Sequence, residues 1–382
     1  MLFRITHRNS RGLSSARRRY LGSISTKPNA FDILFLGRDE FSCLVLQHLY
    51  DAHDVWKTIR VVTQPDMKVG RRGSQLAISP LRTLGEQLTL PVQYIPRDKA
   101  AFRDWKLPAP FDATPPVPSH LLVTASFGRI LTKSMLANFE PSNRLNVHPS
   151  LLPVYRGASP IQHTILNGEK ETGVCVIEMM ERKKGIDAGT IWGTARMNVP
   201  ENSDFTSLRD VLGHEGGRLL VNTLRGILCG KAVPCPQTSD PTAPRAPLIT
   251  SADAIVDFRT MTATQIIRRH RAISHQKPLH VYLRNGRTLQ LHSLSIADAS
   301  HISAHVLPQL YEPGTAFYDS YHRSLLVRCS DKSILKVEKV KQQDRALLAA
   351  KEWWNGVSSD LRVTQNNESG PILLSSDPSI SR

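Results

Sequence analysis

Asp32-Ile-Leu-Phe-Leu-Gly37 is a short apolar run that ends in glycine. A run of this kind, apolar at successive positions, is typical of a strand buried on both faces of a parallel sheet. Residues 41–50 follow with apolar side chains at helical spacing, which predicts a helix packed on that strand. A strand followed by a helix is the repeating unit of the α/β class.

The alternation continues along the chain. Strand-like runs recur at residues 59–63 and 120–124, and helical patterns follow at residues 81–88 and 131–139. We therefore predict a Rossmann-like parallel sheet, in which ligands bind beyond the carboxyl ends of the strands. The first strand is followed by Gly37 alone and not by Gly-x-Gly-x-x-Gly, which disfavours a dinucleotide site.

Polar groups of a candidate site lie within residues 146–162, Asn-Val-His-Pro-Ser-Leu-Leu-Pro-Val-Tyr-Arg-Gly-Ala-Ser-Pro-Ile-Gln, and in Gly185-Ile-Asp-Ala-Gly189. Asn146 and His148 are two residues apart, so on an extended segment their side chains point to the same face. We expect this segment to follow a strand around Leu145 and to lie at the ligand-binding edge of the sheet.

These residue types have complementary chemistry. The Asn146 amide can donate a hydrogen bond to a developing oxyanion, and His148 can hold or pass a proton near neutral pH. Asp187 can orient the imidazole or accept a proton from an attacking amine. No serine or cysteine nucleophile is evidently tied to the set, so the residues indicate direct transfer of an acyl-type group to an outside nucleophile. Taken singly, a turn asparagine, a buried histidine and a capping aspartate also fit structural roles.

The wider motif favours the functional interpretation. Residues 146–162, with Glu171-Thr-Gly-Val174 and residues 185–189 after them, closely resemble the formyltransferases that use 10-formyltetrahydrofolate, and within them the methionyl-tRNA formyltransferases. The resemblance covers about residues 30–356, and its C-terminal part is diffuse. Three further stretches support it: residues 31–41, residues 61–66 (Val-Val-Thr-Gln-Pro-Asp) and Pro313-Gly-Thr315.

The resemblance implies transfer of a formyl group from 10-formyltetrahydrofolate to the α-amino group of methionine on initiator tRNA, for translation initiation in an organelle. Asn146 and His148 would stabilise a tetrahedral oxyanion, and Asp187 would collect the amine proton or fix His148. No metal is implied. By the same analogy four consecutive residues would line the folate site: Ser150, Leu151, Leu152 and Pro153.

Related chemistries remain as alternatives. The same trio serves enzymes that formylate a ribonucleotide amine or an amino sugar, or that hydrolyse formyl-folate. Tyr155-Arg-Gly157 and the C-terminal match argue against the first, and a sugar formyltransferase would not need a basic C-terminal domain. A non-catalytic organellar RNA-binding protein is an alternative from another class.

The composition changes after residue 232, which we predict ends a catalytic domain of residues 30–232. Prolines, serines and threonines in residues 233–250 indicate a linker. Residues 251–357 predict a helix at 262–272, a closing helix at 346–354 and several short strands. The resemblance implies an OB-like β-barrel that helps to hold tRNA. The strands are expected at residues 279–283, 288–294, 325–329 and 334–340.

Four further segments have local features of their own. His275-Gln-Lys-Pro278 stands where relatives tend to have an Asn-Pro-Trp-Pro-like turn, and the polar residues 358–382 are predicted to be a disordered tail. Proline-rich residues 109–119 predict an exposed loop. Residues 181–184, Glu-Arg-Lys-Lys, predict a bulged surface turn in preference to a contact with the tRNA acceptor end.

The charge of the chain fits a polyanionic partner. The formal net charge is +16 and the pI is about 9.9, so we expect salt-sensitive attraction to RNA. Residues 67–74 resemble the family loop that enters the tRNA acceptor region. No apolar run approaches the ~20 residues needed to span a bilayer, and nothing in the sequence demands more than a monomer. The candidate tRNA-contacting cations are Lys68, Arg71, Arg72, Arg268, Arg269 and Arg271.

Residues 1–25 predict a mitochondrial transit peptide. The segment is rich in arginine and serine, and no acidic residue occurs before Asp32. A mitochondrial matrix location follows, with a basic RNA-contacting tail or a plastid signal as alternatives. The five cysteines form no Cys-x-x-Cys pair and are odd in number, which indicates neither a zinc site nor a disulfide framework and fits a reducing compartment.

Overall fold

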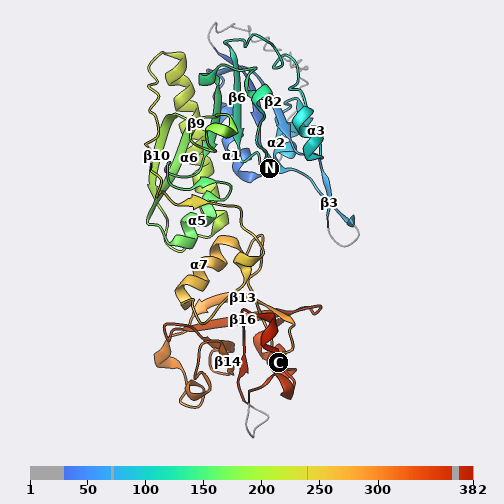
Figure 1. Cartoon of the computed structure of the whole chain (residues 1–382), viewed down its shortest axis with the longest axis vertical. Helices are drawn as coiled ribbons and strands as arrows, with labels where there is room; N and C mark the ends of the chain where they lie inside the picture. The colour runs from blue at the N-terminus through green and yellow to red at the C-terminus, as the bar shows by residue number, and fades with distance from the viewer. Residues whose placement is uncertain (1–29, 70–72, 239, 364–369, 382) are drawn as a thin grey trace, which may run out of the picture.

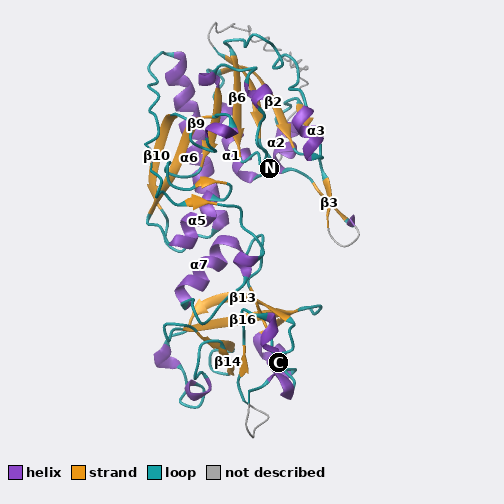
Figure 2. Cartoon of the chain, viewed as in Figure 1, coloured by secondary structure: helices purple, strands orange, loops and turns teal. Residues whose placement is uncertain are grey.

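The computed structural model describes residues 30–69, 73–238, 240–363 and 370–381. They form two domains that follow one another along the long axis of the molecule (Figure 1). Helices gather around the sheet of the first domain, whereas the second domain combines its own strands with helices and loops (Figure 2). The predicted transit peptide, Arg71 and Arg72 lie outside the described residues.

The first domain is built on a seven-stranded sheet with the order β10-β9-β7-β6-β1-β2-β5. The five strands from β7 to β5 are parallel, as the sequence predicts. Strand β9, in contrast, pairs antiparallel with both of its neighbours, β7 and β10. A loop without a crossover helix joins β9 to β10, and such a connection allows only antiparallel pairing of neighbouring strands. The strands are β1 (Phe31–Leu36), β2 (Trp56–Thr63), β5 (Val92–Tyr94), β6 (His120–Ala125), β7 (Arg144–His148), β9 (Glu171–Glu178) and β10 (Ile191–Asn198).

The described residues of this domain contain six α-helices. The predicted helix at residues 131–139 is wrong in length, because α4 spans only four residues after its cap at Thr132, whose hydroxyl accepts a bond from the Met135 amide. Helix α6 packs closely on α1: a Cβ added at Gly213 would lie 2.7 Å from Leu44 Cδ1. The helices are α1 (Glu40–Asp51), α2 (Pro80–Gln87), α3 (Lys99–Asp104), α4 (Lys133–Leu136), α5 (Pro160–Asn167) and α6 (Phe205–Leu228).

Apolar side chains cover both faces of the sheet. In β1, Ile33 and Phe35 belong to the core that contains α1 and α6, while Leu34 and Leu36 belong to a second core on the other face. This two-sided burial is why the strand has an uninterrupted apolar sequence. Phe111 inserts into the second core with 1% of its surface exposed, so the proline-rich loop is anchored at that point and is not wholly exposed as predicted.

The second domain is an antiparallel half-barrel sheet with the order β12-β13-β16-β15-β14-β18, and β17 pairs with β16. Helix α7 (Ala263–Ile273) confirms the helix predicted at residues 262–272, and it begins at a capping box of Thr262 and Gln265. The closing helix α8 (Ala350–Asn355) is shorter than predicted because β17 takes the preceding residues. The strands are β12 (His280–Tyr282), β13 (Thr288–Ile296), β14 (Thr315–Asp319), β15 (Ser324–Arg328), β16 (Ile334–Gln342), β17 (Leu347–Ala349) and β18 (Ile372–Leu373).

The prediction of a disordered tail is wrong for part of residues 358–382. Strand β18 pairs with β14, and Ile372 and Leu374 are almost completely buried, at 1% and 3% exposure. A few apolar residues within a polar segment are enough to add it to the edge of a sheet that is already folded.

The predicted linker also differs from a free spacer. Cys235 exchanges two backbone hydrogen bonds with Ile191 of β10, each 2.8 Å long. Further along, β11 (Arg245–Ala246) pairs in parallel with β8 (Arg156–Gly157). We call residues 235–246 the strap, because backbone bonds at both of its ends attach it to the catalytic domain.

Helix α7 contacts α5 across the boundary between the domains. The Arg268 guanidinium lies over Gly168 at the end of α5, and Arg271 Nη1 donates to Asn202 Oδ1 at 3.1 Å. Arg269 Nη1 donates to the Asp253 carbonyl at 2.8 Å, and burial lowers the pKa of this guanidinium. The three predicted tRNA-contacting arginines of α7 thus make contacts within the protein.

Candidate active site

Strand β7 positions both central polar side chains. Leu145 and Val147 enter the core beneath α1 and α6, so Asn146 and His148 face the opposite side of the sheet. The expectation that this segment is extended is confirmed. Thr124, near the carboxyl end of β6, lies beside Asn146 in register.

Thr124 orients the Asn146 amide. Its hydroxyl donates to Asn146 Oδ1 at 2.7 Å. Because the amide oxygen is occupied in this way, the NH₂ group is left to face a ligand, which is the orientation an oxyanion donor needs. The sequence analysis did not name Thr124, although its place at the carboxyl end of a predicted strand was a usable signal.

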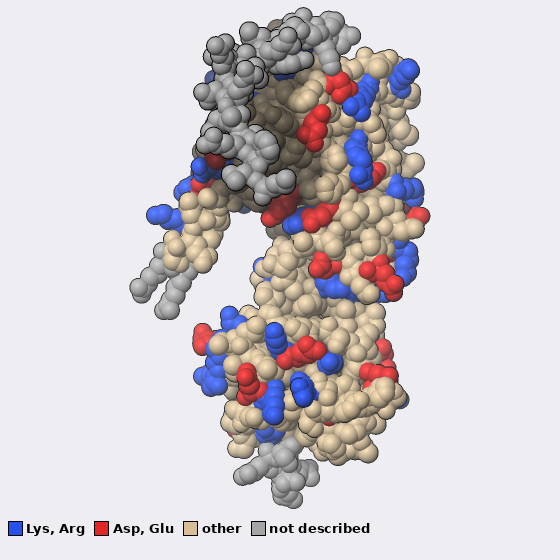
Figure 3. All heavy atoms as spheres, turned by 180° about the vertical axis from the view of Figure 1, so that it is seen from behind, with Lys and Arg blue, Asp and Glu red and all other residues tan. Residues whose placement is uncertain are grey.

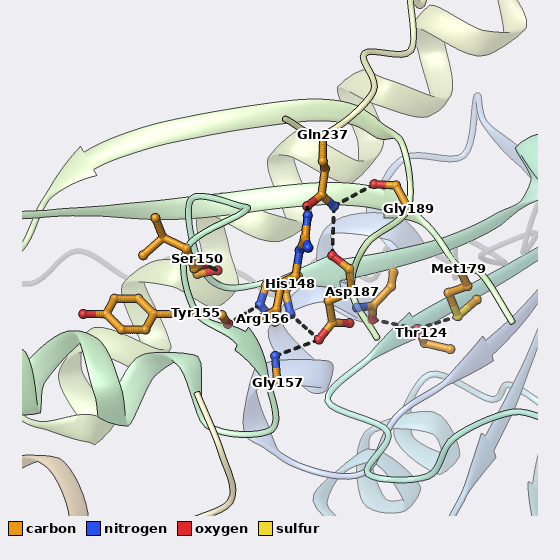
Figure 4. A network of polar contacts seen from close by, with 12 residues as sticks. Thr124, His148, Ser150, Tyr155, Arg156, Gly157, Met179, Asp187, Gly189 and Gln237 are labelled. Atoms are coloured by element: carbon orange, nitrogen blue, oxygen red, sulfur yellow. Dashed lines mark hydrogen bonds and ion pairs between the residues drawn. The ribbon is translucent and has the colours of Figure 1, made fainter. Parts of the chain in front are cut away.

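His148 is 4% exposed and has partners on both ring nitrogens. Nε2 lies 3.0 Å from the Tyr155 carbonyl, which can only accept, so Nε2 carries a proton. Nδ1 faces Asp187 Oδ2 at 3.7 Å. In the neutral ring Nδ1 is therefore the basic nitrogen, and the Asp187 carboxylate lies where it stabilises an imidazolium (Figure 4).

The two residues that contact the ring nitrogens of His148 have unusual backbone conformations. Asp187 has φ of 54° and Tyr155 has φ of 61°, both in the left-handed region. Each such residue costs about 1–3 kcal/mol and persists only when surrounding contacts fix it. Asp187 Oδ2 accepts a bond of 3.0 Å from the Gly157 amide, which supplies one such contact.

A glutamine of the strap supplies more of them. Gln237 Nε2 donates to the carbonyls of Asp187 and Gly189, at 2.8 and 2.7 Å. Gln237 Oε1 accepts from Arg156 Nε and Nη2, at 2.9 and 2.5 Å. Figure 4 shows Gln237 reaching from the strap to the Asp187 loop. The sequence analysis missed Gln237, because a single glutamine in a proline-rich stretch forms no local pattern.

The segment predicted to line the folate site is turned toward β9. Ser150 is buried and its hydroxyl donates to the Val154 carbonyl at 2.7 Å. Leu152 packs with Cys175 and Ile177, and Leu151 lies against Gly173. The described contacts of Ser150, Leu151 and Leu152 are thus contacts within the protein, and Pro153 follows a cis peptide bond. A role for these four residues in folate binding stays a prediction.

A cavity of about 720 Å³ lies between the loops that follow β6 and β9. Phe102, Ile130 and Leu131 supply its apolar lining. Glu181 is the one carboxylate among the described lining residues, and it pairs with Lys133 at 3.8 Å. The remaining charged groups of the lining are all cationic: Lys99, Arg103, Arg129, Arg182 and Lys183.

The loops around this cavity are close in the chain to residues of the candidate site. Residues 128–133 follow the β6 strand that carries Thr124, and residues 181–183 precede Asp187. The basic segment predicted as a bulged turn is a short 3-10 helix (Arg182–Lys184), exposed on the surface. Two of its residues, Arg182 and Lys183, line the cavity.

Lys68 lies on a hairpin that extends from the catalytic domain (Figure 1). The hairpin consists of β3 (Met67–Val69) and β4 (Gln75–Ala77), and its apolar side chains Met67 and Leu76 are more than half exposed. Figure 3 shows Lys and Arg side chains on the rear of both domains with acidic side chains among them, so the basic charge there is not a single continuous patch.

Two findings concern the described residues as a whole. No three or more His, Cys, Asp or Glu side chains among them are grouped so as to hold a metal ion. None of their helices combines the length and apolar character required to traverse a membrane.

Comparisons with known proteins agree with this geometry. Residues 32–224 match the family described as formyl transferase, and residues 248–358 match its C-terminal domain. The methionyl-tRNA formyltransferase of Pelobacter propionicus is 34% identical over 79% of this chain and 86% of its own length. That of Halalkalibacterium halodurans is 32% identical over 87% and 96%.

Solved structures share the fold at low sequence identity. The sugar 3N-formyltransferase WlaRD, determined with dTDP and 5-N-formyl-THF, has a TM-score of 0.54 at 15% identity, over 83% of this chain and 99% of its own. The enzyme HypX of Aquifex aeolicus, in complex with tetrahydrofolic acid, has a TM-score of 0.53 at 16% identity, over 88% and 50%. The two domain matches and the relatives that are 34% and 32% identical over most of its length assign the chain to the methionyl-tRNA formyltransferase family.

Proposed function

We infer that this protein transfers the formyl group of 10-formyltetrahydrofolate to the α-amino group of methionyl-tRNA. The observation that carries this function is the convergence of Asn146, His148 and Asp187, with the Asn146 NH₂ group left available by Thr124. Family membership selects methionyl-tRNA over an amino sugar or a nucleotide amine as the acceptor.

The geometry supports direct attack by the amine. A free α-amino group has a pKa of about 8, so near neutral pH a useful fraction is unprotonated and nucleophilic. Attack on the formyl carbon forms a tetrahedral oxyanion, to which the Asn146 NH₂ donates. His148 Nδ1 takes the proton of the attacking nitrogen while Asp187 stabilises the imidazolium. That proton then goes to N10 as tetrahydrofolate leaves, which completes the formyl amide.

We propose the cavity between the loops that follow β6 and β9 as the place of the folate donor. Its apolar residues fit a flat pterin ring, and its cations fit the carboxylates of the glutamate end. On this proposal Arg182→Ala with Lys183→Ala raises the KM for the donor, while the KM for tRNA changes little. A rise confined to the tRNA KM would instead support an RNA contact for this segment.

Formylation by protein that lacks about the first 25 residues tests the function directly. The reaction would contain 10-formyltetrahydrofolate with charged initiator Met-tRNA, charged elongator Met-tRNA or no acceptor. Rapid formylation of the initiator Met-tRNA alone supports both formyl transfer to Met-tRNA and selection of the initiator. Folate turnover without an acceptor would indicate a hydrolase, and no turnover would indicate a non-catalytic RNA-binding protein.

We propose that the β3–β4 hairpin contacts tRNA through Lys68 and the neighbouring Arg71 and Arg72. An extended, basic hairpin beside the catalytic domain suits the phosphates of an acceptor stem. Lys68→Ala should weaken tRNA binding and reduce its salt dependence by about one counterion. Arg268, Arg269 and Arg271 are proposed as secondary candidates only, since their described contacts are internal.

We further propose that residues 1–25 direct the protein to the mitochondrial matrix and that it acts there as a monomer. The support is the basic, acid-free composition of this segment. Fusing residues 1–30 to a fluorescent reporter tests the first part, and a diffuse or plastid signal would contradict it. Light scattering of the purified protein tests the second.

A further inference from the structure

The Gln237 side chain uses its full hydrogen-bonding capacity. Its two amide protons go to the carbonyls of Asp187 and Gly189, and its oxygen accepts two bonds from Arg156. The two carbonyls flank Ala188, so one side chain holds the backbone on both sides of that residue. Among uncharged side chains, only a primary amide offers this combination of two donors and an acceptor.

The loop held by Gln237 has a conformation that needs support. Gly185 and Asp187 both have positive φ values, 112° and 54°, and Ile186 between them is exposed. The loop also passes close to β9, because a Cβ added at Gly189 would lie 1.8 Å from the Glu178 carbonyl oxygen. Displacement of this turn would move the Asp187 carboxylate away from His148 Nδ1.

The strap contacts both partners of His148. Gln237 binds the backbone of Asp187, which faces Nδ1, and the Pro244 carbonyl accepts a bond of 2.7 Å from the amide of Tyr155, whose own carbonyl binds Nε2. The strap also lies tightly on β8, where a Cβ added at Gly157 would be 2.4 Å from the Ala246 carbonyl oxygen. Residues between the two domains thus form one wall of the catalytic site.

We propose that Gln237 is a positioning residue for formyl transfer, which acts by fixing Asp187 against His148. This inference rests on the proposed function. The Cys235–Ile191 and β11–β8 bonds hold the strap through its backbone, so replacing the Gln237 side chain leaves the strap attached. The role of Gln237 can therefore be tested without detaching the interdomain segment.

Two substitutions separate the contacts of Gln237. Gln237→Met has similar length and makes none of the four bonds, whereas Gln237→Glu can still accept from Arg156 but presents no donor to the two carbonyls. We expect both to lower kcat by about 10- to 100-fold, the scale of a misplaced catalytic group, with KM for both substrates within about threefold. Thr242→Ala, a change at an exposed residue of the same strap whose hydroxyl donates to Asp240, should leave kcat unchanged.

A double-mutant cycle with Asp187→Asn shows whether Gln237 acts through Asp187. With Asp187 already disabled, Gln237→Met should lower kcat less than about threefold further, because interacting residues are not additive. The same 10- to 100-fold loss in that background would overturn the inference, and so would Gln237 variants as active as the wild type. If the Gln237→Met protein does not fold, the same cycle with Gln237→Glu tests the inference by the same criterion. An inactive wild type would instead refute the proposed function.

Discussion

His275 lies flat against Phe205, with ring centroids 3.8 Å apart and an angle of 6° between the planes. Phe205 begins α6 of the catalytic domain, whereas His275 follows α7 of the second domain. The pair therefore joins the two domains. Partial desolvation and the nearby Arg209 lower the pKa of His275, while Asp204 opposes them.

This contact predicts a dependence of stability on pH. Because the folded pKa of His275 lies below its unfolded value of about 6.5, the folded state binds the proton more weakly. The contribution to stability is fully present above about pH 6.5 and is lost as the pH falls below it. The Tm of the wild type should therefore fall more between about pH 7.5 and about pH 5.5 than the Tm of His275→Phe. Parallel curves for the two proteins would contradict this effect.

Asn146→Ala should lower turnover by ~10² to 10³, the usual loss for one oxyanion donor. In the proposed mechanism the side chain donates to the reacting oxygen, and it is remote from the β3–β4 hairpin in the chain, so tRNA binding should be intact. Steady-state formylation and filter binding measure the two quantities. Equal losses in both would argue against an oxyanion role.

Thr124→Val should lower kcat by about tenfold, as expected when one supporting hydrogen bond around a catalytic group is lost. Valine has a similar shape but cannot donate to Asn146 Oδ1, so the amide is free to turn. Thr124→Ser retains the hydroxyl and is the matched control, for which we expect near-normal kcat. Equal activity of the valine and serine variants would show that this bond does not matter.

The cysteines should differ in their reaction with iodoacetamide. Cys229 and Cys235 are exposed. Burial raises the pKa of Cys43 and of Cys329 to about 12, and burial also raises that of Cys175, so few thiolates form at about pH 8. Peptide mass spectrometry of the native protein should show alkylation of the exposed pair alone, and of all five after denaturation. Rapid native labelling of Cys329 would be inconsistent with its burial.

Ile372→Ala should lower the stability of the second domain by about 2–4 kcal/mol, as for other buried isoleucines. The side chain is 1% exposed and its strand pairs with β14. Urea unfolding followed by tryptophan fluorescence, to which Trp353 and Trp354 contribute, would report the change, with Lys351→Ala at an exposed residue of α8 as the control. An unchanged midpoint would mean that the C-terminal segment does not stabilise the sheet.

The parallel strands could be predicted because burial on both faces requires continuous apolar sequence, as in β1. Asn146 and His148 could be paired because the period of a strand is fixed, and Asp187 followed from its motif. Gln237 could not be predicted, because its partners are 48 or more positions away in the sequence and depend on how the strap crosses the site. For the same reason, arginines such as Arg269 could not be separated by sequence into those that bind phosphate and those that bind backbone carbonyls.

The attachment of the strap has a consequence for modular exchange. A catalytic fragment ended at residue 232, the boundary predicted from composition, would lack Gln237 and the segment that pairs with β8. A chimera that takes its C-terminal half from a relative should therefore be joined after Ala246, where the strap has left the site. During evolution, the same arrangement would keep this junction from lengthening or shortening freely, even though its composition is that of a spacer.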